Sequence, residues 1–85
     1  MIKINHVILD ELGLHARPAG QLVKMATKYK CDIQAGSIGH TVDAKSILGV
    51  MSLALKQGDE MIVTFDGEDE PEAAAAVAEF FEKNV

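Results

Sequence analysis

Segments with the two-residue periodicity of strands alternate with segments of helical periodicity along this 85-residue chain. The strand-like segments are 2–8, 31–35, 41–44 and 60–65, and the second and third of them flank a Gly-Ser-Ile-Gly turn. The helical segments are 18–30, 46–55 and a final one that begins at Pro71. The order βαββαβα predicts an α+β fold, with three helices on one face of a four-stranded, mainly antiparallel sheet.

The length and the cysteine count limit what else the chain can be. At 85 residues we expect a single domain, 1–85. Cys31 is the only cysteine, which excludes an internal disulfide and fits a reducing compartment. We find neither a membrane-length apolar run nor a signal peptide. We therefore expect a mature, complete, cytoplasmic protein with no membrane insertion.

The charge balance bears on the class of partner. The formal net charge is -5, and the basic residues are scattered along the chain. Binding to a phosphate backbone requires clustered Lys and Arg side chains. The sequence thus argues against direct binding of nucleic acid.

The segment 13–19, GLHARPA, carries the most specific chemistry. Gly13 permits a sharp backbone turn, and Pro18 is typical of the first turn of a helix. His15 is therefore expected just before a helix N-terminus, where free amides and the helix dipole attract anions. Arg17, the only arginine, could form bidentate hydrogen bonds with phosphate oxygens. Imidazole is a good nucleophile near neutral pH, so this pattern suits phosphoryl transfer.

Pro18 leaves two questions open about this segment. It donates no N–H, so the anion-binding amides would have to be those of Ala16, Arg17 and Ala19. It also disfavours helical dihedral angles at Arg17, so the helix begins either with strain at residue 16 or 17, or only at Pro18. On spacing alone, His15 could equally be a loop residue that precedes a helix by coincidence.

A second segment, 46–55, is apolar nearly all round. A helix this short cannot bury every side in so small a domain, so we expect some of Ile47, Leu48 and Met51 to face water as a docking patch. The expected inward face comprises Val50, Leu53 and Ala54. Ser46 is first of all a good N-cap, and its phosphorylation would add about -1.5 to -2 charges beside the patch. The alternative is that the whole helix is buried in the core.

Other candidate sites are weaker. The histidines His6, His15 and His40 are too far apart in sequence for a zinc motif, and the acidic run 66–72 lacks the spacing of a calcium loop. We expect His6 in a strand and His40 at the edge of a turn. The sequence therefore predicts no metal site and no cofactor.

The segments GLHARPAG at 13–20 and KSILGVMSLALKQG at 45–58 together resemble the HPr family of histidine-containing phosphocarriers, over the whole chain. The run GVMSLA is similar to members from low-GC Gram-positive bacteria. The resemblance implies an open-faced β-sandwich and a covalent phosphoryl carrier rather than an enzyme. It implies that His15 is the phosphohistidine, bonded through Nδ1, and that Arg17 contacts the phosphate.

The resemblance also implies partners. Enzyme I would be the donor, with phosphoenolpyruvate as the original source, and enzyme IIA domains of sugar permeases would be the acceptors. Ser46 would be modified by HPr kinase/phosphorylase, and the phosphoserine form would act with a catabolite-control transcription factor. The implied state is a monomer. The implied partner-binding residues are Ala16, Gly20, Lys24, Thr27, Ile47, Leu48, Gly49 and Met51.

Three positions depart from the family pattern, and three rival functions stay open. Leu12 replaces a small polar residue beside His15, Gly20 weakens a helix interior, and Ile38 before Gly39 makes a type I′ turn less favourable. One rival is a regulatory paralogue that carries no phosphate, against which His15 argues. The others are a regulatory relay without sugar transport and an acidic adaptor with no transfer chemistry.

Overall fold

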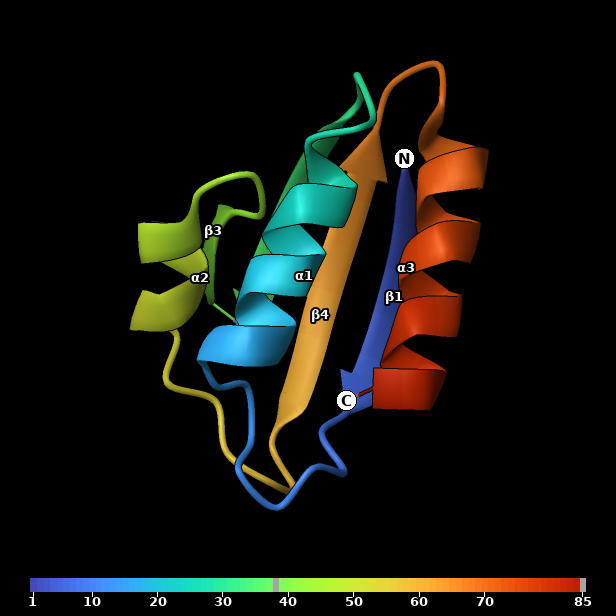
Figure 1. Cartoon of the computed structure of the whole chain (residues 1–85). Coiled ribbons are helices and arrows are strands. Elements are labelled where there is room, and N and C mark those ends of the chain that lie inside the picture. Colours follow the sequence, from blue (N-terminus) through green and yellow to red (C-terminus); the bar gives the residue numbers. More distant parts are fainter. Residues whose placement is uncertain (38, 85) are drawn as a thin grey trace.

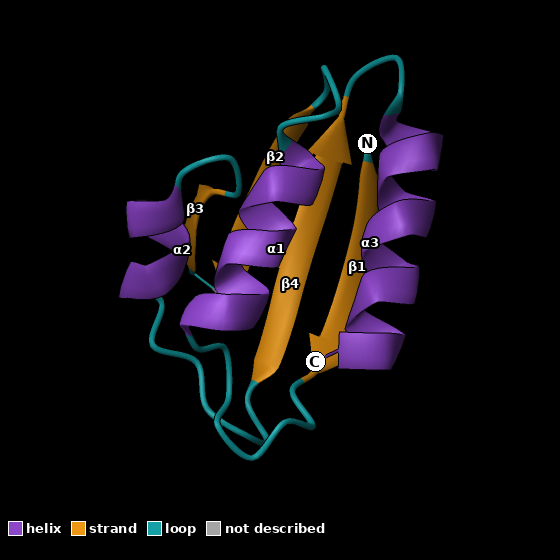
Figure 2. Cartoon of the chain, in the orientation of Figure 1, coloured by secondary structure: helices purple, strands orange, loops and turns teal. Residues whose placement is uncertain are grey.

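The computed structural model describes residues 1–37 and 39–84, so the expectation for the turn at Ile38 lies outside the described residues. One four-stranded sheet has the spatial order β1-β4-β2-β3, with every neighbouring pair antiparallel. Its helices lie on one face (Figure 1 and Figure 2). The elements are β1 (Ile2–Val7), α1 (Ala16–Ala26), β2 (Asp32–Ser37), β3 (His40–Asp43), α2 (Ile47–Ser52), β4 (Glu60–Asp66) and α3 (Glu70–Asn84). The predicted fold class and element order are confirmed.

The core lies between the sheet and the helices. Ile33 and Ala35 of β2 face Phe65 and Val63 of β4 in register, and all four are fully buried. The helices close this layer with apolar residues at helical spacing, namely Ala19, Leu22 and Ala26 of α1 and Ala73, Val77 and Phe81 of α3. Burial of these side chains stabilises the fold in place of disulfides. No helix in the described part of the chain is long and apolar enough to cross a membrane.

The predicted C-terminal ends of two helices are wrong. Helix α1 begins at Ala16, the earlier of the starts that the sequence left open, so Pro18 is its third residue. It ends at Ala26 rather than Lys30. After Ala26 the N–H groups of Lys28 and Tyr29 donate to carbonyls three residues back, those of Met25 and Ala26, so the chain leaves the α-helical bonding pattern in tight turns. Helix α2 ends at Ser52, because Ala54 adopts a left-handed φ of 50°.

The hairpin is tighter than predicted. Gly36 and Ser37 belong to β2, and Ser37 already pairs with His40 of β3. A Cβ added at Gly36 would lie 2.1 Å from the carbonyl oxygen of His40. Glycine at position 36 therefore serves a close strand contact and not the turn itself.

Gly20 provides a stability test of α1. A Cβ built at this position meets no atom of the described residues within 4 Å, so there is room for a methyl group. Gly20→Ala is expected to raise the free energy of unfolding by about 0.5–1 kcal/mol, because alanine loses less backbone entropy in a helix. Urea denaturation measures the change, and a lower midpoint for the variant would contradict it.

The start of α3 is fastened by a carboxylate. Asp69 accepts the backbone N–H groups of Lys30 at 2.8 Å and of Cys31 at 2.9 Å. The bond from Lys30, followed by the contacts with Cys31, holds the pKa of the Asp69 carboxyl below its usual value. Burial and the adjacent Asp69 carboxylate raise the pKa of the Cys31 thiol to about 11. The thiol is therefore held protonated at neutral pH.

Asp69 is expected to make stability depend on acidity. A depressed pKa in the folded state stabilises the protein above the unfolded-state value of about 3.9, and this stabilisation is lost as the pH falls through the folded-state pKa. In Asp69→Asn, the free energy of unfolding should therefore fall less steeply with decreasing pH below about 5. Glu72→Gln, at an exposed carboxylate of the same helix, is the control. Urea denaturation at several pH values measures the free energy of unfolding of the wild type and of the two variants. The same dependence on pH in all three proteins would contradict the assignment.

Candidate functional site: a histidine at the start of α1

The loop between β1 and α1 fixes where the site lies. Gly13 has a φ of 68°, and its N–H donates to the carbonyl of Asp10 at 2.9 Å, which closes a tight turn. The next residue, Leu14, is buried and donates its N–H to the carbonyl of Leu55 at 3.0 Å. This pairing anchors the loop to the segment after α2. His15 therefore follows directly on a fixed piece of backbone.

His15 is the N-cap of α1, in extended conformation with φ of -92° and ψ of -173°. Its side chain makes no capping hydrogen bond, so the imidazole is left for other contacts. The imidazole Nε2 lies 3.7 Å from Oδ2 of Asp10, and both side chains are about one-third exposed. The location of His15 at a helix N-terminus agrees with the sequence prediction, and the neighbouring carboxylate was not foreseen.

The first turn of α1 offers two free amides rather than three. Within the described residues, the N–H groups of Ala16 and Arg17 have no hydrogen-bond partner. The prediction that Ala19 is a third donor is wrong, because its N–H donates to the carbonyl of His15 at 3.0 Å. Two unpaired amides at a helix N-terminus still form a site that attracts an anion.

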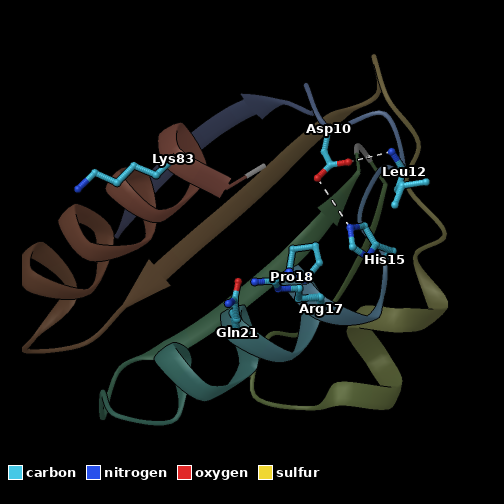
Figure 3. A pocket seen from close by; sticks show the side chains of 7 residues that line it. All are labelled: Asp10, Leu12, His15, Arg17, Pro18, Gln21 and Lys83. Atoms are coloured by element: carbon cyan, nitrogen blue, oxygen red, sulfur yellow. Dashed lines mark hydrogen bonds and ion pairs between the residues drawn. The ribbon is translucent and has the colours of Figure 1, made fainter.

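The imidazole lines an open hollow on the surface (Figure 3). Its lining residues are Asp10, Leu12, His15, Arg17, Pro18, Gln21 and Lys83. Lys83 comes from α3, but its Nζ is held by Oε1 of Glu79 at 2.8 Å. Within the described chain, the guanidinium of Arg17 has no such acidic partner. Arg17 is therefore the lining cation that is available to an incoming anion.

Sequence reasoning missed three of the lining residues: Asp10, Gln21 and Lys83. For Gln21 a signal was present, because it lies four residues after Arg17 on the same face of a helix. Asp10 had the weaker signal of a carboxylate in the loop before His15. No local pattern connects Lys83 to the site, because only the packing of α3 beside β1 brings it there (Figure 1).

The segment around Ser46 has the predicted capping geometry. Ser46 is the N-cap of α2, and its hydroxyl oxygen accepts the N–H of Gly49 at 3.2 Å. Val50 is buried, whereas Ile47, Leu48 and Met51 are 44%, 82% and 40% exposed. The alternative of a wholly buried helix is thus wrong. The expected inward face is only partly correct, because Leu53 is half-buried and Ala54 is exposed.

The remaining candidate residues lie along one face of α1. Ala16, Lys24 and Thr27 are exposed, Gly20 is half-buried, and their spacing of three or four places them on the same side of the helix. Helices α1 and α2 pack against each other on the same face of the sheet (Figure 1). The structure therefore brings the basic side chain of Lys24 and the exposed apolar side chains of α2 onto neighbouring helices.

Comparison with known proteins assigns the family. The family model described as "PTS HPr component phosphorylation site" matches residues 2–83. The chain belongs to the HPr family. A "Phosphocarrier protein HPr" from Lysinibacillus sphaericus is 48% identical over 71 residues, which is 84% of this chain and 81% of that protein. This likeness confirms the predicted low-GC Gram-positive type of HPr.

Solved structures of the family agree with the fold. HPr-C-His from Thermoanaerobacter tengcongensis is 37% identical, with a TM-score of 0.92 over 98% of this chain and 93% of that chain. Crh from Bacillus subtilis, described as a catabolite repression protein that forms a swapped dimer, is 36% identical. Its TM-score is 0.77, over 100% of this chain and 98% of that chain. As an HPr protein, the chain is a phosphocarrier of the phosphotransferase system, which serves sugar transport through a phosphohistidine.

Proposed function

We propose that His15 accepts the phosphoryl group from phosphorylated enzyme I and passes it to enzyme IIA domains of sugar permeases. The observation that carries the proposal is the position of the imidazole at the N-terminus of α1, beside two unpaired amides and Arg17. The ring supplies the nucleophile, and the amides of Ala16 and Arg17 with the guanidinium stabilise charge on the phosphoryl oxygens.

The position of Asp10 supports Nδ1 as the reacting nitrogen. A carboxylate 3.7 Å from Nε2 favours a proton on that nitrogen. The lone pair then resides on Nδ1, the other nitrogen of the ring.

We also propose that the chain is a covalent intermediate in phosphoryl transfer rather than an enzyme. We infer that it acts as a single domain. We infer further that it works in the cytoplasm, where enzyme I and the IIA domains meet.

The partner surface proposed for both exchanges adjoins His15. It combines the α1 face with the exposed side chains of α2, which is suited to partners with an apolar patch and acidic margins. Its members are Ala16, Gly20, Lys24, Thr27, Ile47, Leu48, Gly49 and Met51. We propose that the chain is monomeric in this role, because a shared surface serves two partners in turn. Size-exclusion chromatography with light scattering tests this against a swapped dimer of the kind described for Crh.

A pulse–chase experiment tests the relay. The chain is labelled with enzyme I and radioactive phosphoenolpyruvate, separated from both, and mixed with a purified enzyme IIA domain. We expect the label to move to the IIA domain. Label that enters the chain but stays there would contradict a carrier role, and a chain that takes up no label would contradict the proposal as a whole.

Ser46 is proposed as a regulatory phosphorylation site for HPr kinase/phosphorylase. The support is its half-exposed position at the start of α2, beside the exposed Ile47 and Leu48. A phosphate there would place about two negative charges next to the docking patch and so alter partner choice, including binding to a catabolite-control transcription factor. The kinase and ATP should yield acid-stable phosphate that Ser46→Ala removes. We expect Ser52→Ala to incorporate as much phosphate as the wild type, and Ser46→Ala to incorporate none. A wild type that incorporates no phosphate would contradict the regulatory role.

A further inference from the structure

Asp10 makes three contacts that together place its carboxylate beside the imidazole. Its carbonyl accepts the N–H of Gly13 at 2.9 Å, and its Oδ1 accepts the N–H of Leu12 at 2.9 Å. With Oδ1 held in this way, Oδ2 is directed to Nε2 of His15 at 3.7 Å (Figure 3). The carboxylate is therefore fixed by its own turn before any partner arrives.

We propose that Asp10 is a positioning residue that keeps the proton of His15 on Nε2 and presents Nδ1 to the phosphoryl donor. The proposal rests on the proposed role of His15. At 3.7 Å the contact is longer than a hydrogen bond, so it acts electrostatically on the ring and can shorten when the ring becomes charged.

The chemistry of the step explains why this charge matters. As the bond between phosphorus and its donor atom on enzyme I breaks, its electron pair returns to the donor, and the lone pair of Nδ1 forms the new bond to phosphorus. The proton on Nε2 stays in place, so the imidazole gains positive charge during the transfer. A fixed carboxylate next to Nε2 stabilises that developing charge. In the reverse direction, the electron pair of the N–P bond returns to Nδ1, and the ring leaves as the neutral imidazole that carries its proton on Nε2.

Other charges at the hollow do not replace Asp10. The other charged side chains that line it are Arg17 and Lys83, and both carry the same sign as the charge that develops on the ring. Lys83 is also paired with Glu79. Glu11 is exposed and makes no ion pair with a described residue. Glu11→Gln is therefore a matched control for Asp10→Asn, because each removes one carboxylate charge from the same loop.

The first measurement is the tautomer of the His15 ring, from the 15N chemical shifts of Nδ1 and Nε2 in alkaline buffer. It uses the unphosphorylated protein, so it tests Asp10 even if the proposed relay fails. We expect the proton on Nε2 in the wild type and in Glu11→Gln, and a measurably lower Nε2–H population in Asp10→Asn. An unchanged Gly13 amide signal shows that the turn is intact. A wild-type ring protonated mainly on Nδ1 would contradict the proposal.

The second measurement is the rate of phosphoryl acceptance from phosphorylated enzyme I. In Asp10→Asn the maximal rate should fall about 3- to 10-fold with little change in KM, as expected for a charge that is one-third exposed. Glu11→Gln should match the wild type. Three outcomes would overturn the proposal: equal behaviour of the two variants, a change in KM alone, or a rate loss with unchanged ring 15N shifts.

Discussion

Alanine at position 15 is expected to reduce phosphoryl acceptance from enzyme I below detection. His15 is the one imidazole that the described structure places beside the unpaired amides of α1. His6 is half-buried in β1, where its ring stacks on Phe81 with centroids 4.9 Å apart and its Nε2 has no hydrogen-bond partner among residues 1–37 and 39–84. His40 is exposed at the start of β3. Neither ring adjoins Arg17 in the hollow.

The loss in His15→Ala should not reflect unfolding. The His15 side chain makes no capping hydrogen bond, so its removal is expected to change the free energy of unfolding by less than about 1 kcal/mol. Incorporation of phosphate from radioactive phosphoenolpyruvate measures acceptance, and His40→Ala is the control with normal labelling. Residual labelling of His15→Ala near the wild-type level would mean that another residue is the acceptor.

Gly13→Ala is expected to lower the free energy of unfolding by about 2–5 kcal/mol. A φ of 68° costs an alanine roughly 1–2 kcal/mol, since its Cβ crowds the following carbonyl. The added Cβ would also lie 2.4 Å from the carbonyl oxygen of Leu55 and 2.8 Å from Cα of Lys56. These are backbone atoms that cannot rotate away, and relief of such overlap costs a further 1–3 kcal/mol or so.

Gly58→Ala separates the cost of the left-handed conformation from the cost of the overlap between the added Cβ and the neighbouring backbone. Gly58 has a φ of 92°, but a Cβ there meets no atom of the described chain within 4 Å. This variant should therefore lose only the roughly 1–2 kcal/mol of the left-handed conformation. Urea denaturation of both variants gives the comparison. If Gly13→Ala were no less stable than Gly58→Ala, the close contact between the His15 loop and Leu55 would not exist in solution.

The fold was predictable because the periodicity of the apolar residues agrees, along most of the chain, with the positions of the glycines and prolines that end or begin the elements. The alternation in residues 2–8 and 60–65 identified two strands that pair in register, and the prolines marked the first turns of α1 and α3. The early end of α2 was not predictable. It depends on a left-handed alanine, Ala54, at a position where sequence rules expect glycine.

The site was predictable in part for the same reason. His15, Arg17 and the helix start are neighbours in sequence, so a local motif was sufficient to propose an anion site. Lys83 reaches the hollow only through the docking of α3, and the use of the Ala19 amide depends on the residue at which α1 begins. Such features follow from tertiary packing and exact helix boundaries, which local patterns do not determine.

The chemical form of the phosphorylated protein decides whether Nδ1 of His15 is the phosphoryl acceptor. The chain is phosphorylated with enzyme I and phosphoenolpyruvate, and 1H–15N and 31P spectra of the 15N-labelled product locate the phosphate. We expect one phosphate, labile in acid and stable in base, on Nδ1 of His15. A phosphate on Nε2, on a hydroxyl or carboxylate oxygen, or on another histidine would contradict this expectation.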